Sequence, residues 1–109
     1  MVVIVLKGQG MGHGDDALGA RLLPKFLSKA HRFDGLGAIC FYNAGVQLLA
    51  ADSACLQALS VLDESGVELI ACGTCVEHFG LSESLRLGTI GSMDDIVGRL
   101  AAADKVITP

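Results

Sequence analysis

The sequence predicts an α/β protein with a mainly parallel sheet, because short apolar runs alternate with segments of helical periodicity. The runs at 2–6, 35–42 and 67–71 read VVIVL, GLGAICFY and VELIA. Continuous apolar runs of this length are typical of strands buried on both faces. A last strand, KVIT, is expected at 105–108. Strands that alternate with helices form a sheet covered on both faces, with ligands bound at the carboxyl ends of the strands.

The helices are predicted from the spacing of apolar residues and from residues that start or stop a helix. We expect helices at 15–31, 53–64, 72–80 and 92–102, and a further helical turn at 81–85. Pro24 should kink the first helix. Ser53 is expected to cap the second, Gly66 to stop it, and Ser92 to begin the last. NAGV at 43–46 is predicted to be the exit loop of the second strand.

Composition predicts one domain, 1–109, and excludes several classes of function. Apolar residues make up 51% of the chain, but the longest apolar runs, 1–6 and 38–42, are far shorter than the ~20 residues that span a bilayer. The net charge of -4, the absence of Trp and the scattered basic residues argue against nucleic acid. Met1 is followed directly by VVIVL without a basic region, so we expect a soluble, cytoplasmic protein without structural disulfides.

The high apolar fraction also predicts self-association. A sheet of a few short strands with two faces does not readily hide this much apolar surface in a chain of 109 residues. We therefore expect a homo-oligomer.

The fold prediction places three loops, 8–15, 43–52 and 72–80, at the same edge of the sheet, which is where a functional site is expected. The first loop contains G-x-G-x-x-A at Gly12, Gly14 and Ala17, the pattern of a dinucleotide-binding turn. Asp15 and its neighbour already place carboxylates where a pyrophosphate would bind. A flexible glycine turn with Asp15 as N-cap is the favoured interpretation, and nucleotide binding stays a minor alternative.

Four cysteines fall into two kinds of position. Cys40 lies within a predicted strand and Cys55 on an apolar helix stripe, so both are expected to pack as small core residues. Cys72 and Cys75 lie past the third strand and in the first turn of a helix, where backbone N–H groups favour a thiolate. This position suits a nucleophile. We do not expect Cys72 and Cys75 to serve as core packing residues, because they lie beyond the buried strand.

The Cys72-x-x-Cys75 pair is also compatible with a metal site or a redox motif. A zinc site needs four ligands and the chain has a single C-x-x-C, so that Cys72, Cys75, His78 and His13 could form one only by chance folding, and no metal is expected. The motif follows the third strand, unlike a thioredoxin-like motif, but redox cycling of the pair remains open. His78 shares a helix face with Cys75 and could accept or stabilise a proton, although a surface role is the more usual one.

Four strings together resemble the DsrE/DsrF-like family: MGHGDDALGARLLPKFL, FYNAGVQLL, CGTCVEHFGL and GSMDDIVGRLAAADKVITP. They look most like the carboxyl-terminal domain of YedF-type selenium-metabolism proteins, over nearly the whole chain. The resemblance implies a three-layer α/β/α fold with a five-stranded, mainly parallel sheet, commonly assembled into trimers or hexamers. Sulfur-relay members of the family carry a persulfide on a cysteine eight residues before a glycine, and Cys72 and Gly80 occupy those places.

The resemblance implies a sulfurtransferase-like persulfide carrier for sulfur or selenium, with Cys72 as nucleophile, Cys75 as resolving thiol and no cofactor. YedF-type chains carry an additional TusA-like domain, so a TusA-like protein or a cysteine desulfurase is the expected donor. A non-catalytic oligomeric module that binds a small ligand, a metal or a redox partner is the alternative. The residues expected to line the substrate pocket are Gly12, His13, Asp15, Asn43, Gly45, Gly73 and Thr74.

Overall fold

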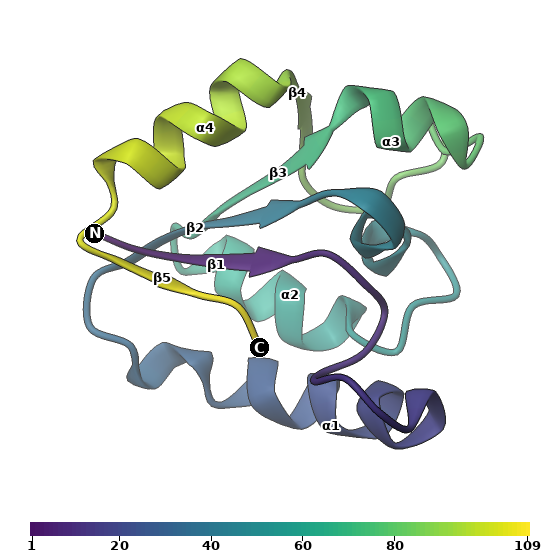
Figure 1. Ribbon diagram of the computed structural model, residues 1–109, viewed down its shortest axis with the longest axis horizontal. Helices are drawn as coiled ribbons and strands as arrows, with labels where there is room; N and C mark the ends of the chain where they lie inside the picture. Colours follow the sequence, from purple (N-terminus) through teal and green to yellow (C-terminus); the bar gives the residue numbers. More distant parts are fainter.

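The computed structural model describes residues 1–109 as an α/β/α sandwich around a five-stranded sheet in which every strand pair is parallel (Figure 1). The strands are β1 (Val2–Leu6), β2 (Leu36–Phe41), β3 (Glu68–Cys72), β4 (Thr89–Gly91) and β5 (Lys105–Ile107), in the order β4-β3-β2-β1-β5. The helices are α1 (Asp16–Ser28), α2 (Leu56–Glu64), α3 (Gly73–His78) and α4 (Met93–Ala102). Two 3-10 helices, η1 (Ala30–Arg32) and η2 (Asn43–Leu49), complete the chain.

Alternation along the strands gives the sheet two separate cores. Ile4, Ile39 and Leu69 point to one face, where they pack with residues of α1 and α2. On the other face Val3 and Ile70 pack beneath α4. Figure 1 shows α1 and α2 together on one side of the sheet and α4 on the other. Because both faces are covered, the central strands are apolar at nearly every position, and this is the pattern from which the fold class was predicted.

Several helix ends differ from their predicted positions. The segment 15–31 is not one helix, because α1 ends at Ser28 and η1 follows it. The second helix begins at Leu56 rather than at 53, and Ser53 is not its cap. The Ser53 hydroxyl instead accepts a hydrogen bond from the N–H of Cys55 (3.0 Å), which closes a turn ahead of the helix.

Two connections also differ from the predicted ones. Residues 43–46 belong to η2 rather than to an irregular loop. The helical turn expected at 81–85 is an irregular turn, and Leu85 forms an isolated antiparallel bridge with Ala50. The residue pattern missed β4, which is only three residues long and has exposed side chains at Thr89 and Ile90. Only the resemblance to a known family led us to expect a fifth strand.

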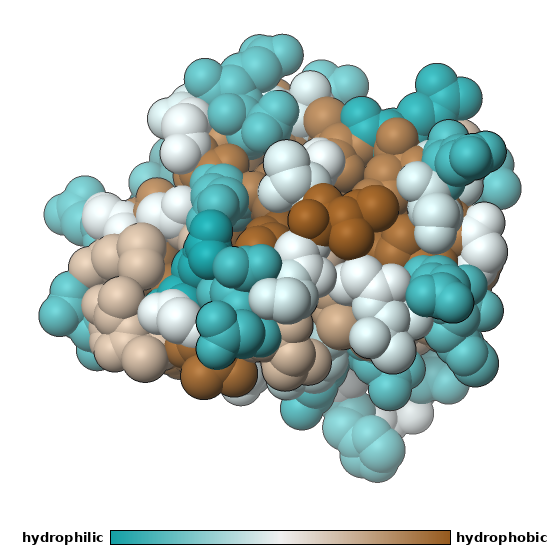
Figure 2. All heavy atoms as spheres, turned by 90° about the horizontal axis from the view of Figure 1, so that it is seen from above, coloured by the Kyte–Doolittle hydropathy of each residue, from teal (hydrophilic) through white to brown (hydrophobic).

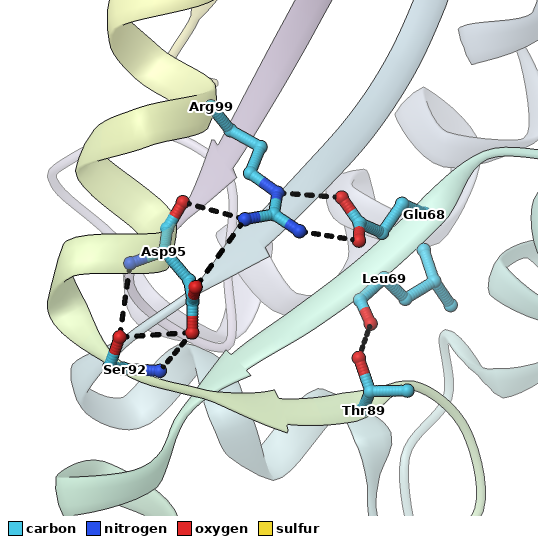
Figure 3. A network of polar contacts seen from close by, with 6 residues as sticks. All are labelled: Glu68, Leu69, Thr89, Ser92, Asp95 and Arg99. Atoms are coloured by element: carbon cyan, nitrogen blue, oxygen red, sulfur yellow. Dashed lines mark hydrogen bonds and ion pairs between the residues drawn. The ribbon is translucent and has the colours of Figure 1, made fainter.

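A polar network holds α4 against the sheet (Figure 3). Ser92 caps α4 through a capping box, in which its hydroxyl accepts from the N–H of Asp95 and the Asp95 carboxylate accepts from the N–H of Ser92. One turn later, Arg99 donates two hydrogen bonds of 2.8 Å to the two carboxylate oxygens of Glu68 on β3. Hydrogen bonding to Arg99 lowers the pKa of Glu68. The network therefore fixes both the start of α4 and its register on the sheet.

Apolar side chains remain exposed on the α4 side of the molecule. Met93 and Val97, one helical turn apart on α4, are each about half exposed, at 49% and 52%. Seen from above the view of Figure 1, apolar residues gather right of the centre, with hydrophilic residues around them and in a second group to their left (Figure 2). We call Met93 and Val97 the α4 patch. No helix in the chain combines the length and the hydropathy that crossing a lipid bilayer requires.

Candidate active site

The candidate site lies where β2 and β3 end side by side. Phe41 of β2 pairs with Ala71 of β3, so the residues that follow both strands emerge at the same edge of the sheet. Cys72 is the last residue of β3 and the N-cap of α3, and Cys75 lies in the first turn of that helix. Asn43 begins η2 directly after β2. Parallel pairing therefore brings Asn43 and the two cysteines together although about thirty residues separate them in the sequence.

Cys72 lies deeper than the sequence suggested. We expected it beyond the buried strand, but its residue is only 3% exposed, and it packs into the core beneath α4 with Ile70 and Ile96. Burial raises the pKa of the Cys72 thiol. The N–H groups of Cys75 and Thr74, together with the side chains of these two residues, lower it by more, so the net pKa is below the ordinary value for cysteine. The Cys72 sulfur is thus both sheltered and acidic.

Cys75 has the opposite properties. Its side chain is half-buried and contacts both cores of the protein. The backbone N–H of Asn43 donates a hydrogen bond to the Cys75 sulfur over 3.1 Å. Burial raises the pKa of Cys75, the N–H of Asn43 lowers it, and the neighbouring Cys72 sulfur raises it again, so that the net pKa is above the ordinary value. The two thiols therefore differ in acidity although they are three residues apart, with Cys72 the one that ionises first.

The backbone around Asn43 is held in an unusual conformation. Asn43 is the only residue other than glycine with a positive φ, of 50°. Its side-chain oxygen accepts a hydrogen bond of 2.8 Å from the N–H of Ala44. Gly45 lies so close to β1 that a Cβ atom there would be 2.0 Å from the carbonyl oxygen of Leu6. The absence of a side chain at Gly45 thus lets η2 approach the sheet and places the N–H of Asn43 beside Cys75.

The remaining residues of the CGTC segment lie around the two sulfurs. Thr74 is exposed in the first turn of α3. Gly73 lies against β4, where a Cβ atom would be 3.2 Å from Cγ2 of Ile90. His78 is exposed at the end of α3, and its ring lies edge-on to Phe79, with centroids 5.0 Å apart. His78 does not contribute to the acidity of either thiol.

The glycine loop after β1 forms a neighbouring hollow rather than a wall of the cysteine site. Gly12 and His13 line a hollow of about 560 Å³ at the end of β1, next to Thr108. Asp15 is the N-cap of α1, because its carboxylate accepts a hydrogen bond of 2.8 Å from the N–H of Leu18. Asp15 is therefore used in capping, as the favoured interpretation of the glycine loop predicted.

The four cysteines are free thiols. Cys40 and Cys55 are both buried, at 0% and 2% exposure, which confirms their prediction as core residues. No group of three or more His, Cys, Asp or Glu side chains is arranged to hold a metal ion. The chemistry available at the edge of the sheet is therefore that of two adjacent thiols and the backbone N–H groups that face them.

The sequence did not reveal two features of this site. Gly91 of β4 pairs with Cys72, so β4 supports Cys72 from the side opposite β2. The only local sign of that strand is the β-branched pair Thr89 and Ile90 just before the capping residue of α4. The second feature is the close approach of Gly45 to β1, which nothing in the residue pattern marks.

Comparison with known proteins gives the following findings. The model of the DsrE/DsrF-like family matches residues 15–109. Among solved structures, the ychN protein from E. coli has a TM-score of 0.72 at 21% identity, with 99% of this chain and 97% of that one covered. Protein MTH1491 of unknown function from Methanobacterium thermoautotrophicum gives 0.72 at 23% identity, with 99% and 97% covered. BT1422 from Bacteroides thetaiotaomicron gives 0.67 at 19%, with 99% and 93% covered. No curated protein matches the chain at a significant level.

Proposed function

The chain belongs to the DsrE/DsrF-like family, and on that premise we propose that it is a sulfurtransferase-like carrier that holds sulfane sulfur or selenium as a persulfide-type adduct on Cys72. The observation that supports this most is the unequal pair of thiols at the end of β3. A carrier needs one thiol whose pKa is lower than that of an ordinary cysteine and which is shielded from unwanted oxidants, and Cys72 has both properties.

The loading step follows ordinary thiolate chemistry. The Cys72 thiolate attacks the outer sulfur of a donor persulfide, R–S–SH, and a new S–S bond forms to Cys72. The S–S bond of the donor breaks, and its electron pair leaves with the donor as R–S⁻. The product is Cys72–S–SH, and no external oxidant or reductant is consumed. N–H groups of Thr74 and Cys75 would stabilise negative charge on the adduct as they stabilise the thiolate.

A resolving role for Cys75 completes the proposed cycle. Attack of the Cys75 thiolate on the Cys72 sulfur atom of the adduct would form a Cys72–Cys75 disulfide and release hydrosulfide, with the sulfane sulfur reduced and the two cysteines oxidised. A dithiol reductant would then restore the pair. His78 would serve as a proton donor or acceptor at the solvent side of α3 in this scheme, where it is exposed.

Intact-mass measurement tests the carrier function directly. The protein is incubated with a cysteine desulfurase and cysteine, and the mass is compared with that of Cys72→Ser and Cys40→Ser variants. Cys40 is a matched control, because it lies in the same core beneath α4 and is equally buried. We expect wild type and Cys40→Ser to gain sulfur and Cys72→Ser to gain none. Equal addition to all three proteins, or none to wild type, would refute the function.

The likeness to YedF-type proteins and the expected partners are part of the same proposal. The donor would be a TusA-like protein or a cysteine desulfurase, and Asn43, which is exposed beside Cys75, would line its approach. Selenium as cargo is tested by repeating the mass measurement with selenocysteine in place of cysteine, so that the desulfurase delivers selenium at the oxidation level of the adduct and no oxidant is needed.

The homo-oligomer expected from composition has a candidate surface in the α4 patch. Half-exposed apolar side chains one helical turn apart are the kind of surface that subunit contacts cover. Val97 follows Met93 by one turn on the same face of α4. We expect a trimer or hexamer by light scattering, and a smaller assembly for Val97→Glu. A monomeric mass for wild type at micromolar concentration would refute this part of the proposal.

A further inference from the structure

Acidity and accessibility favour different members of the Cys72 and Cys75 pair. Cys72 is the more acidic thiol but is only 3% exposed, whereas Cys75 is less acidic and more accessible. A bulky acceptor protein would therefore reach Cys75 before it reached Cys72. The question is whether the fold equips Cys75 to hold sulfur itself, and the hydrogen bond from Asn43 bears on that question.

We propose that the backbone N–H of Asn43 makes Cys75 a second sulfur-holding position, so that sulfane sulfur moves from an inner site on Cys72 to an outer site on Cys75. This inference rests on the proposed carrier function and adds a transfer step to it. Asn43 acts as a positioning residue through its main chain, because it is the N–H rather than the side chain that faces the sulfur.

Two unusual features of the backbone place this N–H group beside the Cys75 sulfur. A positive φ at a residue other than glycine is uncommon, and Asn43 is the only instance in the chain. Gly45 then allows η2 to approach β1, with no room for even a Cβ atom against the carbonyl of Leu6. The side-chain oxygen of Asn43 accepts a hydrogen bond from the N–H of Ala44 and so is engaged within η2. The result of both features is a donor 3.1 Å from the Cys75 sulfur.

The transfer step balances without a co-reactant. The Cys75 sulfur attacks the outer sulfur of Cys72–S–SH, a new S–S bond forms, and the electron pair of the broken bond remains on Cys72 as a thiolate. The Cys75 proton ends on Cys72, so the net change is Cys72–S–SH plus Cys75–SH to Cys72–SH plus Cys75–S–SH. A thiol of low pKa leaves faster, and the N–H groups around Cys72 make it such a leaving group. The N–H of Asn43 stabilises the attacking sulfur.

Three substitutions at Asn43 test the positioning role without added sulfur. Asn43→Gly keeps the N–H and readily adopts a positive φ, Asn43→Ala adopts it at some cost, and Asn43→Val is the least compatible with it. In a Cys72→Ser background, the rate of Cys75 alkylation by iodoacetamide is measured against pH. Loss of a hydrogen bond to a charged sulfur should lower the rate at pH 8 on the order of tenfold in Asn43→Val, less in Asn43→Ala and hardly at all in Asn43→Gly.

A shifted pH profile separates positioning from general damage, because a merely loosened structure would expose Cys75 and speed its alkylation. Asn43→Ala provides the same ordering if Asn43→Val does not fold. Equal rates and equal pH profiles in Asn43→Gly and Asn43→Ala would overturn the positioning role.

The second measurement locates the sulfur. Proteins with both cysteines are loaded with glutathione persulfide, and fragment-ion mass spectrometry assigns the added sulfur to Cys72 or Cys75. We expect both positions to be filled in wild type and in Asn43→Gly, and the share on Cys75 to fall in Asn43→Ala and Asn43→Val. Sulfur on Cys72 alone in every protein would overturn the outer site and leave the carrier function intact. No sulfur on either cysteine of wild type would overturn the carrier function together with the transfer step.

Discussion

Replacement of Gly45 by alanine is the most direct test of the way η2 is held against the sheet. The added Cβ atom would lie 2.0 Å from the carbonyl oxygen of Leu6 and 2.7 Å from its carbonyl carbon. These atoms belong to the backbone of β1, which is paired on both sides by β2 and β5. The clash cannot be relieved by a side-chain rotation, so η2 or the end of β1 has to move.

The size of the effect follows from two contributions. Overpacking a core typically costs about 1–3 kcal/mol of unfolding free energy. Displacement of η2 also strains the hydrogen bond of 3.2 Å that the N–H of Tyr42 donates to Leu6, worth about 1 kcal/mol. We therefore expect Gly45→Ala to lose about 2–4 kcal/mol. Gly98 is the matched control, because a Cβ atom there meets nothing within 4 Å in the interior of α4. Gly98→Ala should gain roughly 0.5–1 kcal/mol from helix propensity.

Urea unfolding at equal protein concentration measures both effects. With a slope of about 1–3 kcal/mol per molar for a chain of this size, Gly45→Ala should shift the midpoint down by about 1–2 M. Gly98→Ala should shift it up by a few tenths of a molar. The steric reasoning is wrong if Gly45→Ala unfolds within about 0.5 kcal/mol of wild type, the range of an ordinary surface substitution.

Three further predictions follow from the α4 side of the molecule. Ser92→Ala should lower the unfolding free energy measured in urea by about 1 kcal/mol, because it removes the cap of α4. Ser84 is an exposed control whose hydroxyl makes no hydrogen bond, and Ser84→Ala should cost less than about 0.5 kcal/mol. Equal losses would contradict the capping role. Burial raises the pKa of Cys40 to about 11. At pH 8, iodoacetamide should therefore not alkylate Cys40 until the protein unfolds. Prompt alkylation of Cys40 in the native protein would show that its thiol is accessible. The hydrogen bond from Arg99 lowers the pKa of Glu68, so this pair stabilises the fold fully at pH values above the usual Glu pKa of 4.5. The stabilisation is lost as the pH falls through the lower pKa that Glu68 has in the folded protein. Glu68→Gln should therefore flatten the acid side of the stability curve, and Arg99→Ala should do the same.

The sequence predicted best those elements whose residues all obey one local rule. Residues 2–6 are apolar because β1 is buried on both faces, and every one of them is buried in the structure. The start of α4 was predicted from Ser92, and Ser92 forms the capping box together with Asp95. In both cases the local pattern and the tertiary environment agree, so no knowledge of distant residues was needed.

Where distant residues decide the structure, the sequence was silent or misleading. The strand β4 is a strand only because β3 lies beside it, and two of its three residues are exposed, so it has no apolar pattern of its own. Gly45 resembles any turn glycine until the carbonyl of Leu6 is placed against it. Ser53 has the chemistry of an N-cap, but its hydroxyl accepts a hydrogen bond from the N–H of Cys55, which precedes the first residue of α2. These features depend on contacts across the fold rather than on neighbours in the chain.

Comparison of Cys40 with Cys72 shows what makes a cysteine reactive in this fold. Both side chains pack in the core beneath α4 and both are almost fully buried, yet the pKa of Cys40 is raised and that of Cys72 is lowered. Burial raises the pKa of both thiols, but only at Cys72 do hydrogen bonds from Cys75 and Thr74 outweigh it. Cys40 lies within β2, where its neighbours' N–H groups are used by the adjacent strands. Cys72 lies at the end of β3, where N–H groups of the following turn face its sulfur and have no carbonyl partner in the sheet. The low pKa of Cys72 therefore depends on its place at the end of β3, where the first residues of α3 can donate hydrogen bonds to its sulfur.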